Sequence, residues 1–164
     1  MTRKASFGPH VSPRTRVLVL GSLPGEASLR QQRYYAHPSN RFWHLAGAVI
    51  GVDLPALGYE ARLRALDDAG IGLWDTIASA RREGSLDTAL REIEARPLAD
   101  FVAALPQLRA VAFNGAASAS IGRRQLGEPD GLTLVDLPSS SAANAAMPLA
   151  EKQARWDILR KFLD

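Results

Sequence analysis

The run Val17-Leu18-Val19-Leu20 constrains the fold more than any other stretch of this chain. Four consecutive β-branched or aliphatic residues predict a short strand that is buried on both faces, as in a parallel sheet covered by helices. A turn rich in glycine and proline, residues 21–25, follows at once. Ligands of open α/β sheets bind beyond the carboxyl ends of the strands, so this turn is where we expect a ligand.

The rest of the chain alternates between predicted strands and predicted helices. Three further strands are predicted at 71–76, 109–113 and 132–136. Helices are predicted over 26–33, 42–50, 59–69, 97–105, 116–125 and 148–163, and a loop over 78–88. This alternation predicts a parallel sheet covered on both faces, in a single domain over residues 1–164. Residues 1–15 are predicted to form an irregular basic arm.

Composition and motif spacing exclude several classes of chemistry. The chain has no cysteine, which rules out disulfides, thiolate catalysis, iron–sulfur clusters and cysteine-bound zinc. Its three histidines lack the spacing of a zinc site. Walker, dinucleotide-binding and Gly-x-Ser-x-Gly motifs are also missing from the sequence. We therefore expect no metal and no cofactor, and a site built from amides, hydroxyls, carboxylates and aromatic rings.

The positive charge of the chain comes almost entirely from arginine. The formal net charge is +3, and Lys4, Lys152 and Lys161 are the only lysines. Arginine pairs well with phosphates, so nucleic acid is a permitted partner, although a solvated basic surface explains the charge nearly as well. No apolar run approaches the roughly 20 residues of a membrane span. We therefore expect no membrane partner, and a cytoplasmic location is compatible with the lack of cysteine.

Six short motifs follow one another along the chain. They are GSLPG at 21–25, YYAHPSNRFW at 34–43, GIGLWD at 70–75, REGSLD at 82–87, FNG at 113–115 and LPSSS at 137–141. With this ordered set the chain resembles the uracil-DNA glycosylase superfamily and, within it, the hypoxanthine-DNA glycosylase (DNA-deoxyinosine glycosylase) branch. The resemblance covers nearly the whole chain. It implies a three-layer α/β/α sandwich around a four-stranded parallel sheet.

The same resemblance implies an activity. The expected protein is a monomeric DNA-repair glycosylase that hydrolyses the N-glycosidic bond of a deaminated base, hypoxanthine above all, and leaves an abasic site. Its partner is DNA that contains such a base, and it uses neither metal nor cofactor.

Site residues also follow from the resemblance. Asn40 is expected to be catalytic, with its amide carbonyl orienting the attacking water. Tyr35 is expected to stack on the extruded base, Asp75 to accept a hydrogen bond from N1 of hypoxanthine, and Asn114 to donate one to O6. Gly21, Ser22 and Leu23 are also expected to contact the base. The residues expected to contact DNA are Ser139, Ser140, Ser141 and Asn144.

Two positions depart from the superfamily. Leu23 stands where most members carry Asp or Asn, and Leu137 stands where relatives carry His or Asn. An aliphatic side chain cannot hold a water, so the water-positioning group must come from elsewhere.

Several alternatives stay open at the level of sequence. The base could be uracil or xanthine, the chain could be a catalytically inactive DNA-binding module, or it could be an unrelated α/β enzyme for a small phosphorylated ligand. Asn40 could do no more than cap the helix that follows it, and Asn114 could be a turn residue. The neighbouring Arg81 and Arg82 are expected to be solvated.

Overall fold

Four parallel strands form the centre of the protein in its computed structural model, which describes residues 3–143 and 146–164. Their spatial order is β3 (Ile71–Asp75), β2 (Val17–Gly21), β6 (Ala110–Asn114) and β7 (Thr133–Leu137). Every residue of β2 is buried, because this strand has a neighbour on each side and helices on both faces. The predicted doubly covered strand is therefore confirmed.

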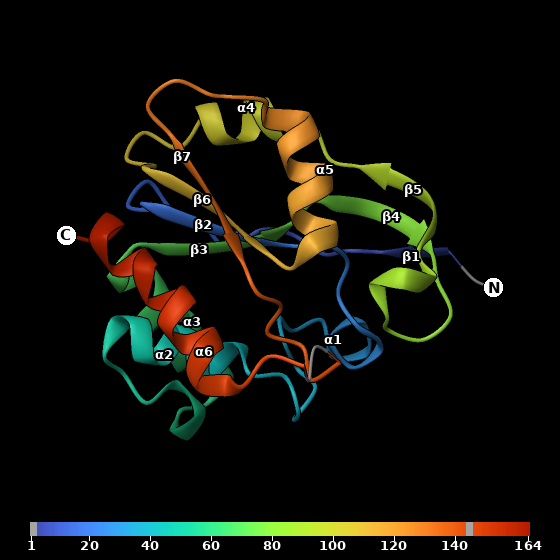
Figure 1. Cartoon of the computed structure of the whole chain (residues 1–164), viewed down its shortest axis with the longest axis horizontal. Helices are drawn as coiled ribbons and strands as arrows, with labels where there is room; N and C mark the ends of the chain where they lie inside the picture. The colour runs from blue at the N-terminus through green and yellow to red at the C-terminus, as the bar shows by residue number, and fades with distance from the viewer. Residues whose placement is uncertain (1–2, 144–145) are drawn as a thin grey trace.

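Alternate side chains of β2 point into two separate hydrophobic cores. Val17 and Val19 pack into one core, and Leu18 and Leu20 pack into the other. The first core is covered by α2 (Phe42–Ile50), α3 (Tyr59–Ala69) and α6 (Leu149–Trp156), and the second by α4 (Leu98–Ala103) and α5 (Ala116–Leu126). Figure 1 shows these two helical layers on opposite sides of the sheet. The predicted three-layer α/β/α sandwich is confirmed.

A second, smaller sheet lies beside the first. Its antiparallel strands are β1 (Arg3–Ala5), β4 (Ile77–Arg81) and β5 (Arg91–Ala95), in the spatial order β1-β4-β5. The prediction of a loop over 78–88 is therefore wrong in its first part. Small residues fill much of β4, and nearly all of β5 is exposed, so backbone pairing with distant strands creates this sheet rather than an apolar pattern.

The N-terminal arm is ordered, against the prediction of an irregular segment. Lys4 pairs with Ala80 as part of β1, and His10 forms a backbone bridge with Leu73 of β3. The hydroxyl of Tyr34 also donates to the carbonyl of Gly8 at 2.7 Å. The arm thereby covers the outer edge of β3, which would otherwise leave backbone donors and acceptors unpaired. A local reading of the sequence misses this, because every partner is distant in the chain.

Shorter elements complete the chain. They are α1 (Glu26–Gln31) and three 3₁₀ turns, η1 (Leu54–Ala56), η2 (Asp87–Ala89) and η3 (Asp157–Phe162). The helix predicted over 148–163 is thus divided into α6 and η3, since its last turns tighten. In the described part of the chain, the helices are all too short or too polar to cross a membrane.

The carboxyl ends of the four parallel strands meet at one edge of the sheet. Gly21 lies opposite Asp75, and Asn114 lies opposite Leu137. Polar residues or loops follow each of these positions, so the register of the sheet gathers them in one place.

We expect Gly122→Ala to lower the free energy of unfolding. A Cβ at this position of α5 would lie 2.2 Å from a ring atom of Phe113 in β6. Overpacking of this kind costs about 1–3 kcal/mol, against a helix-propensity gain of about 1 kcal/mol. Chemical denaturation of the variant measures the difference. Gly8→Ala is the matched control, because a Cβ there meets nothing within 4 Å. Equal stability of both variants would contradict the close packing of α5 on the Phe113 ring.

Candidate active site

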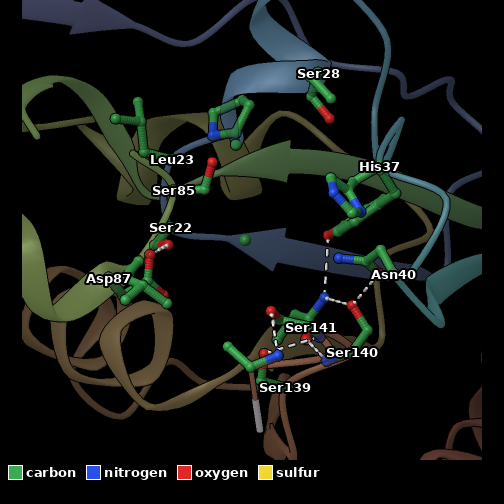
Figure 2. Close-up of a pocket in the computed structure, with 18 of the residues that line it drawn as sticks. Ser22, Leu23, Ser28, His37, Asn40, Ser85, Asp87, Ser139, Ser140 and Ser141 are labelled. Carbon is green, nitrogen blue, oxygen red and sulfur yellow. Dashed lines mark hydrogen bonds between the residues drawn. The ribbon is translucent and has the colours of Figure 1, made fainter. Parts of the chain in front are cut away.

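A pocket of about 720 Å³ opens at the carboxyl ends of the parallel strands. This volume falls in the usual range for small-molecule sites, about 300–1,000 Å³. Its lining comes from the turn 21–28, the segment 34–40, the strand ends at Asp75 and Asn114, the loop 85–88 and the loop 139–143. Figure 2 shows side chains from these separate segments facing a common space.

The floor of the pocket depends on a glycine. A Cβ on Gly21 would lie 2.7 Å from Oδ1 of Asp75 and 3.4 Å from the hydroxyl of Tyr35. A side chain at this position would therefore displace the carboxyl group or the phenol. Gly21 belongs to the site because it lets these two groups meet at the end of β2.

Asp75 is a buried acid without a full set of partners. It is 4% exposed, and its Oδ2 has no hydrogen-bond partner among the described residues. Burial raises the pKa of Asp75 to about 8; Arg96 opposes this rise and Asp87 adds to it. At neutral pH the group is mostly a neutral acid, which donates one hydrogen bond and accepts others. The raised pKa favours the protonated acid over the carboxylate that the sequence led us to expect at this position.

Tyr35 is held in an unusual conformation. Its φ of 52° lies in the left-handed region, which is strained for a bulky residue and is concentrated at functional sites. One ring face stacks on Phe42 with a centroid distance of 3.9 Å, and the backbone carbonyl accepts from Nε1 of Trp43 at 3.1 Å. The ring face that packs on Phe42 is therefore not available to stack on a base. Burial raises the pKa of Tyr35, which keeps the phenol neutral.

A chain of hydrogen bonds joins three elements behind the pocket. Nδ2 of Asn114 donates to the hydroxyls of Ser140, at 2.9 Å, and of Tyr35, at 3.3 Å. Oδ1 of Asn114 accepts from the backbone N–H of Ser140 at 2.9 Å. The hydroxyl of Ser140 in turn donates to Oδ1 of Asn40 at 2.8 Å. Both hydrogens of the Asn114 amide are used inside the protein, so donation to O6 would require breaking one of these bonds.

The carbonyl of Asn40 is also occupied. Besides the Ser140 hydroxyl, it accepts the backbone N–H of Phe42 at 2.9 Å. The backbone N–H of Phe42 can only donate, so its partner must be the oxygen of the Asn40 side chain, and this fixes the orientation of the Asn40 amide. Nδ2 has no hydrogen-bond partner among the described residues, and Figure 2 shows it directed into the pocket. Asn40 precedes the N-cap residue Arg41 and holds the first amide of α2, and with both donors in place its carbonyl has no room to orient a water.

The turn after β2 is held by residues that sequence reasoning missed. Arg82 is 1% exposed, against the prediction of a solvated side chain, and it donates to the carbonyls of Leu23, at 3.3 Å, and Pro24, at 2.5 Å. The hydroxyl of Ser22 donates to Oδ1 of Asp87 at 2.6 Å. Arg82 and Asp87 both lie in the REGSLD motif, which was the available signal.

Leu23 contributes mainly to packing. Its side chain is buried in a small cluster with Ile77, Ala80 and Leu90, although the residue also borders the pocket. It offers no polar side-chain group to a base or a water.

The three serines of the loop 139–141 have different roles in the site. Ser140 is 1% exposed and its hydroxyl is used internally, so it supports the site and is not free for a phosphate. Ser139 and Ser141 line the pocket, and the carbonyl of Ser141 accepts from Nζ of Lys152 at 3.3 Å. The expected DNA contact Asn144 lies outside the described residues.

Comparison with known proteins identifies similar sequences and structures. The Uracil DNA glycosylase superfamily profile matches residues 9–162. A Hypoxanthine DNA glycosylase from Methanosarcina barkeri is 42% identical over 113 residues, which are 69% of this chain and 72% of the relative. The Hypoxanthine DNA glycosylase of Methanosarcina acetivorans is 35% identical over 162 residues, 95% of this chain and 97% of that protein.

The fold is also similar to a solved structure. The NMR structure of a candidate Uracil DNA glycosylase from Methanosarcina acetivorans superposes with a TM-score of 0.87 at 34% identity. The superposition covers 98% of this chain and 99% of the other.

We expect Asp75→Asn to stabilise the protein more at high pH than at low pH. Between its ordinary pKa of 3.8 and about 8, folded Asp75 keeps a proton that the unfolded chain has released. The free energy of unfolding of the wild type therefore falls as the pH rises through this window, and Asn removes that fall. One pKa unit corresponds to about 1.4 kcal/mol, so the relative gain should reach at least about that size.

Thermal melts at about pH 5 and about pH 9 measure this difference. Asp53→Asn is the control, since it makes the same substitution at an exposed position. A pH-independent effect of Asp75→Asn would show that Asp75 is ionised in the folded protein.

Proposed function

Because the chain belongs to the Uracil DNA glycosylase superfamily, we propose that it removes hypoxanthine from DNA. The superfamily match confirms the resemblance indicated by the ordered motifs, and with it a DNA glycosylase that hydrolyses an N-glycosidic bond and leaves an abasic site. Hypoxanthine is the base that the names of two curated relatives specify. The observation that carries the proposal is the buried acid Asp75 in a pocket at the strand ends that is large enough for a base.

Base extrusion explains why the site is a pocket and not a flat surface. The glycosidic bond is not accessible inside a stacked duplex, so the nucleotide must rotate out into the enzyme. A purine is smaller than the ligands that cavities of this size hold. The open face of Tyr35 would stack on the extruded ring, and such stacking contributes about 1–3 kcal/mol per base.

Asp75 supports recognition of hypoxanthine. N1 of hypoxanthine carries a hydrogen and O6 accepts one, so a neutral acid can accept from N1–H and donate to O6 at the same time. Adenine presents the reverse pattern, which a neutral acid could also meet, whereas an ionised carboxylate would repel the N1 lone pair of adenine. Discrimination against adenine should therefore increase as the pH rises through about 8. Asn114 acts in this scheme as a positioning residue that holds Tyr35 and Ser140.

Asn40 is assigned to the leaving base. Bond cleavage develops positive charge on the sugar and negative charge on the base, and a preorganised donor stabilises the latter. Nδ2 of Asn40 is such a donor, because its own carbonyl is fixed by Phe42 and Ser140.

The partner is DNA that contains a deaminated base. Ser139 and Ser141, at the rim of the pocket, are proposed to contact the phosphate backbone, with Arg41 and Lys152 beside the same loop. One chain supplies the whole described lining of the pocket, so a monomer is sufficient for the reaction. A cytoplasmic location, where chromosomal DNA is reached directly, fits this role.

A panel of duplex oligonucleotides tests the proposed function. Each duplex carries one hypoxanthine, uracil, xanthine or unmodified base, and alkali converts abasic sites into strand breaks. We expect breaks first and most completely at hypoxanthine, with none in the unmodified duplex. Breaks at uracil or xanthine alone would reassign the base. Tight binding without breaks would instead show a DNA-binding module.

We expect Asn40→Asp to lose base release while the fold is retained. The carboxylate keeps an acceptor for Phe42 and Ser140 and removes the donor. Loss of one such donor costs roughly 10²–10³ in rate, measured under single turnover at saturating enzyme. Asn40→Ala should lose similar activity and also about 1 kcal/mol of stability, because the hydrogen bond that Oδ1 accepts from the backbone N–H of Phe42 disappears. Wild-type rates in Asn40→Asp would remove the donor from the mechanism.

A further inference from the structure

A second acidic residue, Asp87, borders the pocket and has no task in the scheme above. It lies at the first position of η2, in a loop that covers the turn after β2. Oδ1 accepts the 2.6 Å hydrogen bond from Ser22, which Figure 2 shows across the pocket from Asn40. Within residues 3–143 and 146–164, no hydrogen bond or ion pair occupies Oδ2. One carboxylate oxygen is therefore fixed and the other is available.

Hydrolysis needs a group that orients the water and takes its proton, and other residues of the pocket are unsuited to this. Nδ1 of His37 accepts the backbone N–H of Ser39 at 3.1 Å, so the neutral ring carries its hydrogen on Nε2 and has no free acceptor. The Asn40 carbonyl is occupied by two donors, and Leu23 has no polar group. Asp75 is buried at the floor, under the space that the base would fill. Glu26 is engaged by Lys4. Asp87 combines a place at the surface, with its side chain partly removed from water, and a fixed orientation.

We propose that Asp87 orients the attacking water and acts as its general base, with Ser22 as the residue that positions its carboxylate. This inference rests on the proposed function. The water oxygen forms a bond to C1′ as the bond from C1′ to the base breaks, and the electron pair of that bond leaves with the base. One water proton passes to Oδ2 of Asp87, and it returns through solvent to the departing base, so that Asp87 becomes a carboxylate again. Atoms and charge balance without a further reactant.

The surroundings of Asp87 influence its pKa, and the reaction rate should depend on whether its carboxylate is protonated. Partial removal from water raises the pKa of Asp87, while the Ser22 hydroxyl and Arg82 oppose the rise. The charged or titratable groups that face it are Arg82, Asp75 and Tyr35. Burial raises the pKa values of Asp75 and Tyr35, which keeps both groups protonated in acid, so a loss of activity at acidic pH would report Asp87. The rate should fall as the pH drops and the carboxylate is protonated.

The decisive variant is Asp87→Asn, which keeps the acceptor for Ser22 and removes the base. We expect the single-turnover rate of hypoxanthine release to fall by roughly 10²–10⁴, the usual contribution of a general base. DNA affinity, measured by fluorescence anisotropy, should stay close to that of the wild type. The acid limb of the rate–pH profile should disappear. Glu83→Gln is the matched control, because it removes a carboxylate from the same loop outside the pocket lining and should leave the rate and profile unchanged.

Ser22→Ala provides a second test of the proposal that leaves Asp87 in place. It should lower the rate by about tenfold and shift the acid limb to higher pH, since the hydrogen bond that lowers the pKa of Asp87 is lost. Melting curves of each variant establish that it is folded. If the wild type releases no base from any duplex, the proposed function fails. If the wild type is active and Asp87→Asn keeps both its rate and its acid limb, the role of Asp87 is overturned while the function stands.

Discussion

The close approach of the Asp75 carboxyl to the backbone of Gly21 is the contact on which the site depends. It requires β2 and β3 to run parallel in register, so that the two residues end side by side. It also requires glycine, because a Cβ would take the place of the carboxyl oxygen. The outcome is an acid, 4% exposed, at the floor of a pocket, with one oxygen that no residue in the described part of the chain contacts by a hydrogen bond. Such a group is costly to bury, and a ligand that pairs with it would recover part of that cost.

The central sheet could be predicted from sequence, and the peripheral sheet could not. Continuous apolar runs at 17–20 and 110–113 have few alternatives to a doubly covered strand, and the structure places both there. Strand β5 shows no such pattern, since four of its five positions are exposed. Its conformation, like that of the arm at β1, follows from pairing with β4 across long stretches of chain. Local patterns do not contain that information.

The candidate site was predictable as a set of residues but not as a set of roles. The motifs brought together Asn40, Tyr35 and Asp75, and the structure places all three at one pocket. Which atom of the Asn40 amide faces that pocket depends on Phe42 and Ser140, and the second of these is 100 residues away. The protonation of Asp75 likewise depends on burial by the whole fold. Arg82 was the clearest failure, because arginine is rarely buried and nothing local indicated its carbonyl partners.

Arg82 gives the molecule a mechanical property. Its guanidinium donates to carbonyls of Leu23 and Pro24, and also to that of Gly84, so it fastens the turn after β2 to a loop 59 residues away in the sequence. Ser22 and Asp87 lie on the two fastened segments and are joined by their own hydrogen bond. Any tilting of the loop when a strand of DNA arrives would carry the turn with it. The two segments would then move together as one rigid unit, and the distance between Ser22 and Asp87 would not change.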